Sequence, residues 1–590
     1  MKQFFKYVLA TIVGMLCVAA LMFLMGLATL GSIALSSSSE PVVEDGSVLR
    51  LSLSGSLSER AVDDPFSSFM GNEALESQGL DDMIKAIRVA KDNDNIKGIY
   101  IEGGIFSADF ASLQELRAAL LDFKKSKKFV VAYSDNYLQG AYYIASTADK
   151  VWLNPSGMVD WRGIASQPIF FTELLEKIGV KMQVFKVGTY KSAVEPYILT
   201  QMSDANREQV SSFVGDIWQQ MVKDVAASRR VKADSLNAYA DHYITFAAAK
   251  DYVKMNLVDS LTYIDGVRAK LRSLSAQDEV KLVEVQEVAK LYKPEKSDNE
   301  VAVYYAEGDI VDEAAEGVWS ANAPQIVGQQ VVADLDKLAD DDDVKAVVLR
   351  INSGGGSAYA SEQMWRAIQL LKKKKPVVVS MSGMAASGGY YMSCGADYIV
   401  AEPTTLTGSI GIFGMVPDAS GLLVDKLGLH FDVVKTNEAA DFGASGRPFS
   451  PAEAAAMQGY VNRGYALFLS RVAAGRKMKT EEVDRIAQGR VWTGNQALKL
   501  KLVDKLGTLD DAVAEAARRA KVKDYAVASY PAQASWMDNL MQKMQGDDYL
   551  EQKLQVSLGE YYAPLRFIRS LRNKRDMIQA RILFEPNFVK

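Results

Sequence analysis

Two residues in different halves of the chain have the side chains needed for acyl transfer. Ser409 stands in the turn sequence Thr-Gly-Ser-Ile-Gly, and Lys191 stands in Gly-Thr-Tyr-Lys-Ser-Ala-Val-Glu-Pro. A serine hydroxyl attacks a carbonyl carbon when a base takes its proton, and a lysine can be that base once burial has lowered the pKa of its amine. The pair therefore suggests a serine hydrolase, if the fold brings the two side chains together.

An internal repeat supports this pairing. Residues 96–164 align without a gap on residues 344–412, at a constant offset of 248. The position of Ser409 is Trp161 in the first copy, and the counterpart of Lys191, one residue out of register, is the lysine-free stretch Thr-Asn-Glu-Ala-Ala-Asp around Ala440. Each copy has kept one member of the pair, which predicts one composite site built by both halves.

Other residues compete for these roles. Ser387, in Met-Ala-Ala-Ser-Gly-Gly-Tyr-Tyr, is a rival nucleophile, because its counterpart in the first copy is Gln139, so this serine too occurs in only one of the two copies. The ordinary interpretation of Ser387 is a helix cap. Ser192 could orient the lysine amine, but an ordinary surface Lys-Ser pair is an equally good interpretation. Both histidines lie outside the repeated glycine-rich segments, so a Ser-His-Asp triad has few candidates.

A glycine-rich turn could supply the backbone donors that an oxyanion needs. The sequence Arg-Ile-Asn-Ser-Gly-Gly-Gly-Ser, residues 350–357, follows an expected strand and precedes an expected helix. Neither GxGxxG nor GxxxxGK[ST] is present, which argues against nucleotide binding.

Composition excludes several other classes. The chain has 590 residues, a formal net charge of −6, two cysteines and two histidines. An acidic chain gives no support for nucleic-acid binding. So few cysteines and histidines make a disulfide framework or a zinc site improbable, and we expect no metal and no cofactor.

The N-terminus predicts a membrane anchor. Residues 7–35 carry no charge, and a bilayer span needs about 20 apolar residues. Lysines precede this run and acidic residues follow it, so residues 1–6 are expected in the cytoplasm and the body outside it. The run is longer than the core of an ordinary cleaved signal peptide.

Strands alternating with helices predict an α/β fold with largely parallel sheets. In the second half we expect a helix over 325–338, strands over 346–351 and 377–380, and helices over 360–371 and 385–394. A charged stretch, residues 293–299, is the expected linker. The expected domains are therefore 46–292, which supplies Lys191, and 300–521, which supplies Ser409, followed by a helical tail, 522–590.

These motifs make the chain resemble the long, duplicated form of the signal peptide peptidase A family, in the superfamily of the Clp proteases and crotonases. The resemblance implies two tandem Clp protease/crotonase-like domains of repeated β-β-α units. It also implies that Ser409 is the nucleophile and Lys191 the general base, and it decides against Ser387, although that segment holds the nucleophile in Clp proteases. The family usually has proline where this chain has Gly354. The expected oxyanion donors are Gly355 and then the amide of Ile410.

The resemblance further implies a membrane-anchored serine endopeptidase that cleaves remnant signal peptides through an acyl-enzyme. It implies a bowl-shaped homo-tetramer in the bacterial cytoplasmic membrane, with its body on the periplasmic side and apolar peptides as partners. Two alternatives stay open: a catalytically silent oligomeric scaffold that binds peptides, and acyl-CoA chemistry. The sequence leaves open whether the dyad forms within one chain or between chains.

Overall fold

A computed structural model describes residues 6, 14–15, 42–61, 77–314, 324–533 and 578–581. Most of the expected anchor lies outside these residues. No helix within the described ranges is long and apolar enough to cross a bilayer.

The first half is built on a parallel sheet with the strand order β2-β1-β3-β4-β5-β7, and β8 also pairs with β1. The strands are β1 (Ser47–Ser58), β2 (Ser77–Gly79), β3 (Ile96–Ser107), β4 (Phe129–Tyr137), β5 (Lys150–Val159), β7 (Ser260–Leu261) and β8 (Leu282–Glu284). The helices associated with this sheet are α3 (Leu80–Asp92), α4 (Phe110–Phe123), α5 (Gln139–Ala145), α9 (Ala249–Lys254), α10 (Ile264–Ser275) and α11 (Val285–Ala289).

The second half repeats this plan in the order β18-β16-β14-β12-β9-β20, with β15 joining β14 to β19. Its strands are β9 (Glu300–Glu307), β12 (Val344–Ser353), β14 (Val377–Ala386), β15 (Tyr398–Ala401), β16 (Leu406–Gly408), β18 (Val491–Thr493), β19 (Lys505–Leu506) and β20 (Ala526–Tyr530). Its helices are α12 (Gly328–Asp340), α13 (Ala358–Leu371), α14 (Gly388–Ser393), α17 (Gly494–Lys499) and α18 (Leu509–Ala520). Every residue of β14 is buried, as expected for a parallel strand covered on both faces.

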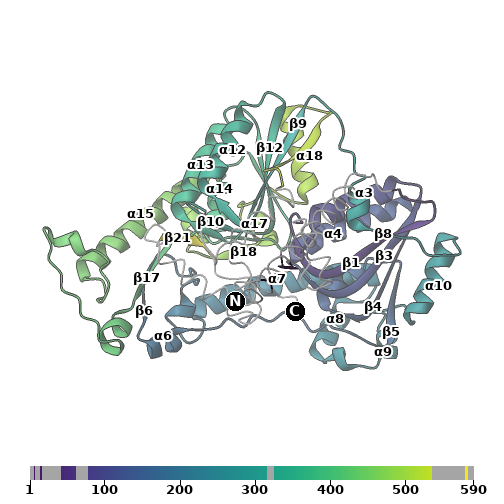
Figure 1. Cartoon of the computed structure of the whole chain (residues 1–590), viewed down its shortest axis with the longest axis horizontal. Helices are drawn as coiled ribbons and strands as arrows, with labels where there is room; N and C mark the ends of the chain where they lie inside the picture. Colours follow the sequence, from purple (N-terminus) through teal and green to yellow (C-terminus); the bar gives the residue numbers. More distant parts are fainter. Residues whose placement is uncertain are drawn as a thin grey trace.

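A third sheet mixes the two halves and the tail. Its order is β11-β10-β13-β21-β17-β6, formed by β11 (Gln325–Val327), β10 (Asp309–Val311), β13 (Gly355–Ser357), β21 (Ile578–Arg581), β17 (Phe413–Asp418) and β6 (Lys181–Lys186). Strand β6 of the first half lies antiparallel to β17 of the second half, and both form an arm at the left of Figure 1. The two repeats are therefore interlocked in space.

Each half also contributes one long helix with a short helix packed against it: α7 (Asp204–Arg229) with α8 (Ala233–Asp241) in the first, and α15 (Pro451–Arg476) with α16 (Thr480–Ile486) in the second. A further short helix of the first half, α6 (Thr172–Ile178), contacts β6. The side chains of Ser203 and Ser450 cap α7 and α15 by accepting a hydrogen bond from a backbone amide of the first turn. From the first half, α7 reaches the second half, where Asp216 accepts a 2.5 Å hydrogen bond from the hydroxyl of Thr493.

A buried ion-pair cluster also joins the halves. The guanidinium of Arg350 donates to Glu59 at 2.8 Å and to Glu115 at 2.5 Å, and all three side chains are buried. Two carboxylates of the first half thus neutralise one arginine of the second.

The α/β class and the predicted strands are confirmed, and three local predictions are wrong within the described residues. Residues 325–327 form β11, so the helix expected over 325–338 begins only at Gly328. Residues 385–386 belong to β14, so the helix expected over 385–394 begins only at Gly388. The tail was expected to be helical, but its described segments are the strands β20 and β21, because each pairs with a strand edge that the body offers.

Candidate active site

Lys191 lies at the centre of the candidate site. Its side chain is 1% exposed, and its amine lies within hydrogen-bond distance of the hydroxyl oxygens of both candidate nucleophiles, 2.8 Å from Ser387 and 3.0 Å from Ser409. It also donates to the carbonyl oxygen of Ser409 at 3.2 Å. Both serines are fully buried. The composite site expected from the repeat therefore forms within a single chain.

Burial lowers the pKa of the Lys191 amine well below its ordinary value, and desolvation is the cause. Among the described residues, the hydrogen-bond partners of this amine are neutral serine groups rather than carboxylates. A neutral amine in this position can accept a proton from a serine hydroxyl.

The second half fixes the loop that carries the lysine. The amide of Tyr190 donates to the carbonyl of Gln488 at 2.8 Å. At the next position, Gly489 has φ +77°, and a Cβ there would lie 2.7 Å from the backbone of Lys191, so only glycine fits. The lysine backbone is thus held against a glycine turn from the other repeat.

Gln209, on α7, is a positioning residue that the sequence analysis missed. Its side-chain amide donates to the carbonyl of Tyr190 and to the hydroxyl of Ser192, both at 2.9 Å, and its oxygen accepts from the amide of Val491. The Ser192 hydroxyl therefore accepts a hydrogen bond from Gln209. This contact holds the loop in place and does not orient the Lys191 amine. Only the three-dimensional contact could identify Gln209, since nothing in its local sequence is distinctive.

The two serines differ in backbone geometry. Ser387 occupies the junction of β14 and α14 with φ 55° and ψ −110°, a strained conformation for a residue with a side chain. A serine on such a strand-to-helix turn presents its hydroxyl beside the free amides of the helix start. Ser409 also has a positive φ, 47°, and both serine amides are bonded, that of Ser387 to the carbonyl of Gly408 at 2.8 Å and that of Ser409 to the carbonyl of Arg490 at 2.7 Å, but Ser409 does not begin a helix. Both serines contact Lys191, so this contact does not show which of them is the nucleophile. The strained backbone at the start of a helix favours Ser387 as the nucleophile.

An extended segment runs beside these serines. The tail strand β21 pairs antiparallel with β13 on one side and with β17 on the other. Its Ala580 is fully buried, and the carbonyl oxygen of Ala580 lies 2.1 Å from where a Cβ on Gly355 would be and 3.0 Å from where one on Gly388 would be. The body therefore has a groove that accepts one extended strand with a small side chain, next to the residue that follows Ser387.

The two expected oxyanion donors occupy different surroundings. Gly355 has φ +97° and borders the Ala580 carbonyl, while its amide donates to the hydroxyl of Ser353 at 3.1 Å. Ile410 is buried, and its carbonyl accepts from the amide of Gly489. Gly354, where the resemblance implied proline, directly precedes β13.

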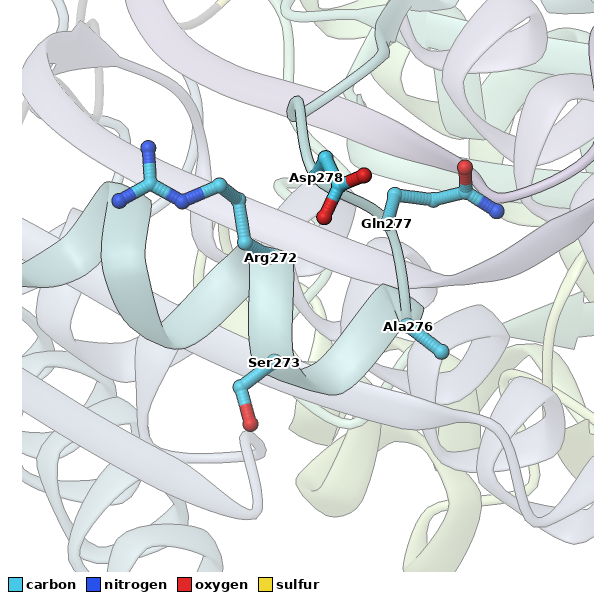
Figure 2. Close-up of a pocket in the computed structure, with 5 residues that line it drawn as sticks. All are labelled: Arg272, Ser273, Ala276, Gln277 and Asp278. Carbon is cyan, nitrogen blue, oxygen red and sulfur yellow. The ribbon is translucent and has the colours of Figure 1, made fainter.

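Two further features of the described residues bear on metal and ligand binding. Within the described ranges, no three His, Cys, Asp or Glu side chains are grouped so as to hold a metal ion. Figure 2 shows a hollow at the end of α10, on the side of the molecule opposite β6 and β17 in Figure 1, lined by Arg272, Ser273, Ala276, Gln277 and Asp278. All five come from one short segment, and none belongs to the serine-lysine cluster.

Comparisons with known proteins identify the class. The model of peptidase family S49 matches residues 122–278 and 369–523, and the Clp protease model matches residues 319–404. Protease 4 of Salmonella typhi is 39% identical over 488 residues, which cover 80% of this chain and 77% of that protein. Protease 4 of Haemophilus influenzae is 36% identical, covering 77% of this chain and 75% of that protein. The chloroplastic serine protease SPPA of Arabidopsis thaliana is 30% identical, covering 81% and 70%.

The fold and these relatives define a serine protease. The chain belongs to peptidase family S49, whose model matches it twice, once in each repeat.

Proposed function

We propose that this protease is a membrane-anchored endopeptidase that cleaves remnant signal peptides with a serine-lysine pair. The observation that carries the proposal is the fully desolvated amine of Lys191, held between two serine hydroxyls beside a groove occupied by an extended strand. A buried lysine with no carboxylate partner destabilises the fold, and acid-base chemistry is a physical reason for keeping it.

In this proposal Lys191 is the general base and the two serines divide the remaining work. Ser387 is the nucleophile, because its strained turn stands at the start of α14 and the strand in the groove presents a carbonyl next to Gly388. Ser409 orients the lysine through its hydroxyl and its carbonyl oxygen. This reverses the roles that the sequence resemblance implied for the two serines. The amide of Gly388 replaces those of Gly355 and Ile410 as the proposed oxyanion donor, because the Gly355 amide already donates to the hydroxyl of Ser353.

The chemistry balances with these groups alone. Lys191 takes the proton of the Ser387 hydroxyl as its oxygen bonds to the peptide carbonyl carbon, and the carbonyl electron pair becomes an oxyanion beside the amide of Gly388. When the oxyanion collapses, the C–N bond breaks and the lysine ammonium gives its proton to the leaving amine. Water then attacks the ester with Lys191 as base, and the carboxylic acid leaves as the serine regains its proton.

The groove suits an apolar peptide bound as a strand. A peptide inserted between β13 and β17 gains main-chain hydrogen bonds on both sides, and alternate side chains face the body. The buried position of Ala580 favours small residues at one subsite. Remnant signal peptides are rich in such apolar and small residues, and an anchor over residues 7–35 would keep the groove at the outer face of the membrane.

The test is cleavage of a synthetic signal peptide by the full chain in detergent micelles, with products identified by mass spectrometry. Cleavage within the apolar stretch, lost in the Lys191→Ala variant, is the expected result. Unchanged cleavage by Lys191→Ala would refute the proposed chemistry. Tight binding of the peptide without cleavage by the parent protein would instead support the scaffold alternative.

A further inference from the structure

The turn formed by residues 488–490 contacts both loops of the serine-lysine cluster. Its first carbonyl accepts a hydrogen bond from the amide of Tyr190 at 2.8 Å, and its last carbonyl accepts one from the amide of Ser409 at 2.7 Å. The glycine at its centre lies against the backbone of Lys191. The position of this turn therefore helps to set the distance between the lysine loop and the Ser409 turn.

The side chain of Arg490, the last residue of this turn, lies between two aromatic rings and is only 18% exposed. Its guanidinium carbon is 4.6 Å from the centre of the Tyr190 ring and 4.4 Å from that of the Trp492 ring, within the range of cation–π attraction. The guanidinium also donates to the phenol oxygen of Tyr190 at 3.1 Å and pairs with Glu208 of α7 at 2.8 Å. The phenol in turn donates to Glu208 at 3.1 Å. Arg490 thus ties the turn to the residue that precedes Lys191.

The internal repeat links the cluster of Tyr190, Glu208 and Arg490 to the site rather than to the fold. The serine caps of the two long helices recur in both copies, as expected for features that only support the fold. The three residues of the cluster do not recur. Their counterparts, at offsets of 249, 247 and 248, are Ala439, Ala455 and His242. Like Lys191, each of the three is therefore present in one copy only.

We propose that Arg490 is a positioning residue for the general base: its side chain holds Tyr190 on the 488–490 turn and so keeps the amine of Lys191 beside the serines and away from water. A lysine side chain is a flexible stem, so its amine stays between two hydroxyls only if the backbone that carries it is fixed. Arg490 acts through this backbone and not through contact with the substrate. The inference rests on the serine-lysine chemistry proposed above.

The test measures kcat, KM and their pH dependence for a fluorogenic peptide, with the full chain in detergent micelles. Arg490→Met keeps an apolar stem between the rings but removes the charge and the donors. Its kcat should fall about 10- to 100-fold, as expected when a reacting group is displaced by up to about 1 Å, while KM stays at the parent value. Arg490→Lys keeps a cation over the rings and should lose less.

The pH profile separates positioning from a general loss of structure. The base must be neutral, so the rate rises with pH as Lys191 loses its proton. Burial holds the pKa of this amine well below its ordinary value, and water that enters a loosened loop would raise it again. The acid limb of kcat should therefore move to higher pH in both Arg490 variants.

Arg471→Met is the matched control. The guanidinium of Arg471 also lies over an aromatic ring, 3.9 Å from the centre of Trp365, and pairs with Glu362, but none of these residues belongs to the serine-lysine cluster. This variant should keep the parent kcat and acid limb. Thermal midpoints identify the variants that are folded at the assay temperature.

Parent values of kcat and of the acid limb in Arg490→Met, or in Arg490→Lys if only that variant folds, would overturn the inference. Equal changes in the Arg490 and Arg471 variants would also overturn it, because the effect would then be one of general stability. Parent-like cleavage by Lys191→Ala would instead refute the proposed chemistry. The two failures are distinguishable, because the first leaves the Lys191→Ala protein inactive.

Discussion

Replacing Ser387 and Ser409 separately should distinguish the two hydroxyls that contact Lys191. Ser387→Ala removes the proposed nucleophile, so peptide cleavage should fall to background. Ser409→Ala removes one hydroxyl, 3.0 Å from the amine, while the hydroxyl of Ser387 at 2.8 Å and the backbone carbonyl of residue 409 at 3.2 Å remain as partners. A lost hydrogen bond to a buried group costs about 1–3 kcal/mol. The rate should therefore fall about 5- to 150-fold, at roughly 1.4 kcal/mol per tenfold change.

The assay combines kcat/KM for a fluorogenic peptide with fluorophosphonate labelling and mass spectrometry of the labelled peptide. The label should map to the peptide containing Ser387 and persist, more slowly, in Ser409→Ala. Ser192→Ala is the matched control, because this hydroxyl contacts Gln209 and not the amine; its kcat/KM should change less than about fivefold, the effect of a weak hydrogen bond. A label on Ser409, with normal labelling of the Ser387→Ala protein, would refute the assignment of roles.

Three further outcomes follow from the same contacts. Lys191→Met should raise the thermal midpoint at pH 7, because the lysine binds a proton in the unfolded chain that its buried amine resists in the folded protein. The increase in the midpoint should shrink as the pH rises and vanish above about 10.4, the pKa of an unperturbed lysine. An increase that is independent of pH would contradict this reasoning. Arg350→Met leaves Glu59 and Glu115 buried without their cation and should cost about 3–5 kcal/mol in urea unfolding, whereas an unchanged midpoint would show that the cluster is dispensable. Deleting residues 578–590 removes β21 from the groove, so KM for a peptide should fall while kcat stays similar; an unchanged KM would show that the strand does not compete.

Much of the site could be predicted because duplication leaves a record in the sequence. The asymmetry between Lys191 and its lysine-free counterpart, and between Ser409 and Trp161, identified a composite site before any contact was known. The same comparison could not rank Ser409 against Ser387, since both differ from their counterparts. Their ranking depends on backbone dihedral angles and on the start of α14, and a pattern that predicted the helix from residue 385 obscured the strained turn at Ser387.

The tail and Gln209 lay beyond sequence reasoning for a different reason. β21 is four residues long and pairs with strands more than 160 residues away, and Gln209 contacts the lysine loop and β18 across the repeat boundary. Such contacts depend on where several elements meet, and local pattern carries no signal for them.

The sequence by itself determined the α/β class, the duplication and the residue types of the site, because hydrophobic periodicity and repeat comparison are local properties of the chain. Only the tertiary structure decided that one chain completes the site, that both serines contact the lysine, and that its amine is desolvated. Those properties arise when β6 and the loop after it cross from the first repeat into the second, and burial by distant residues then sets the pKa of Lys191.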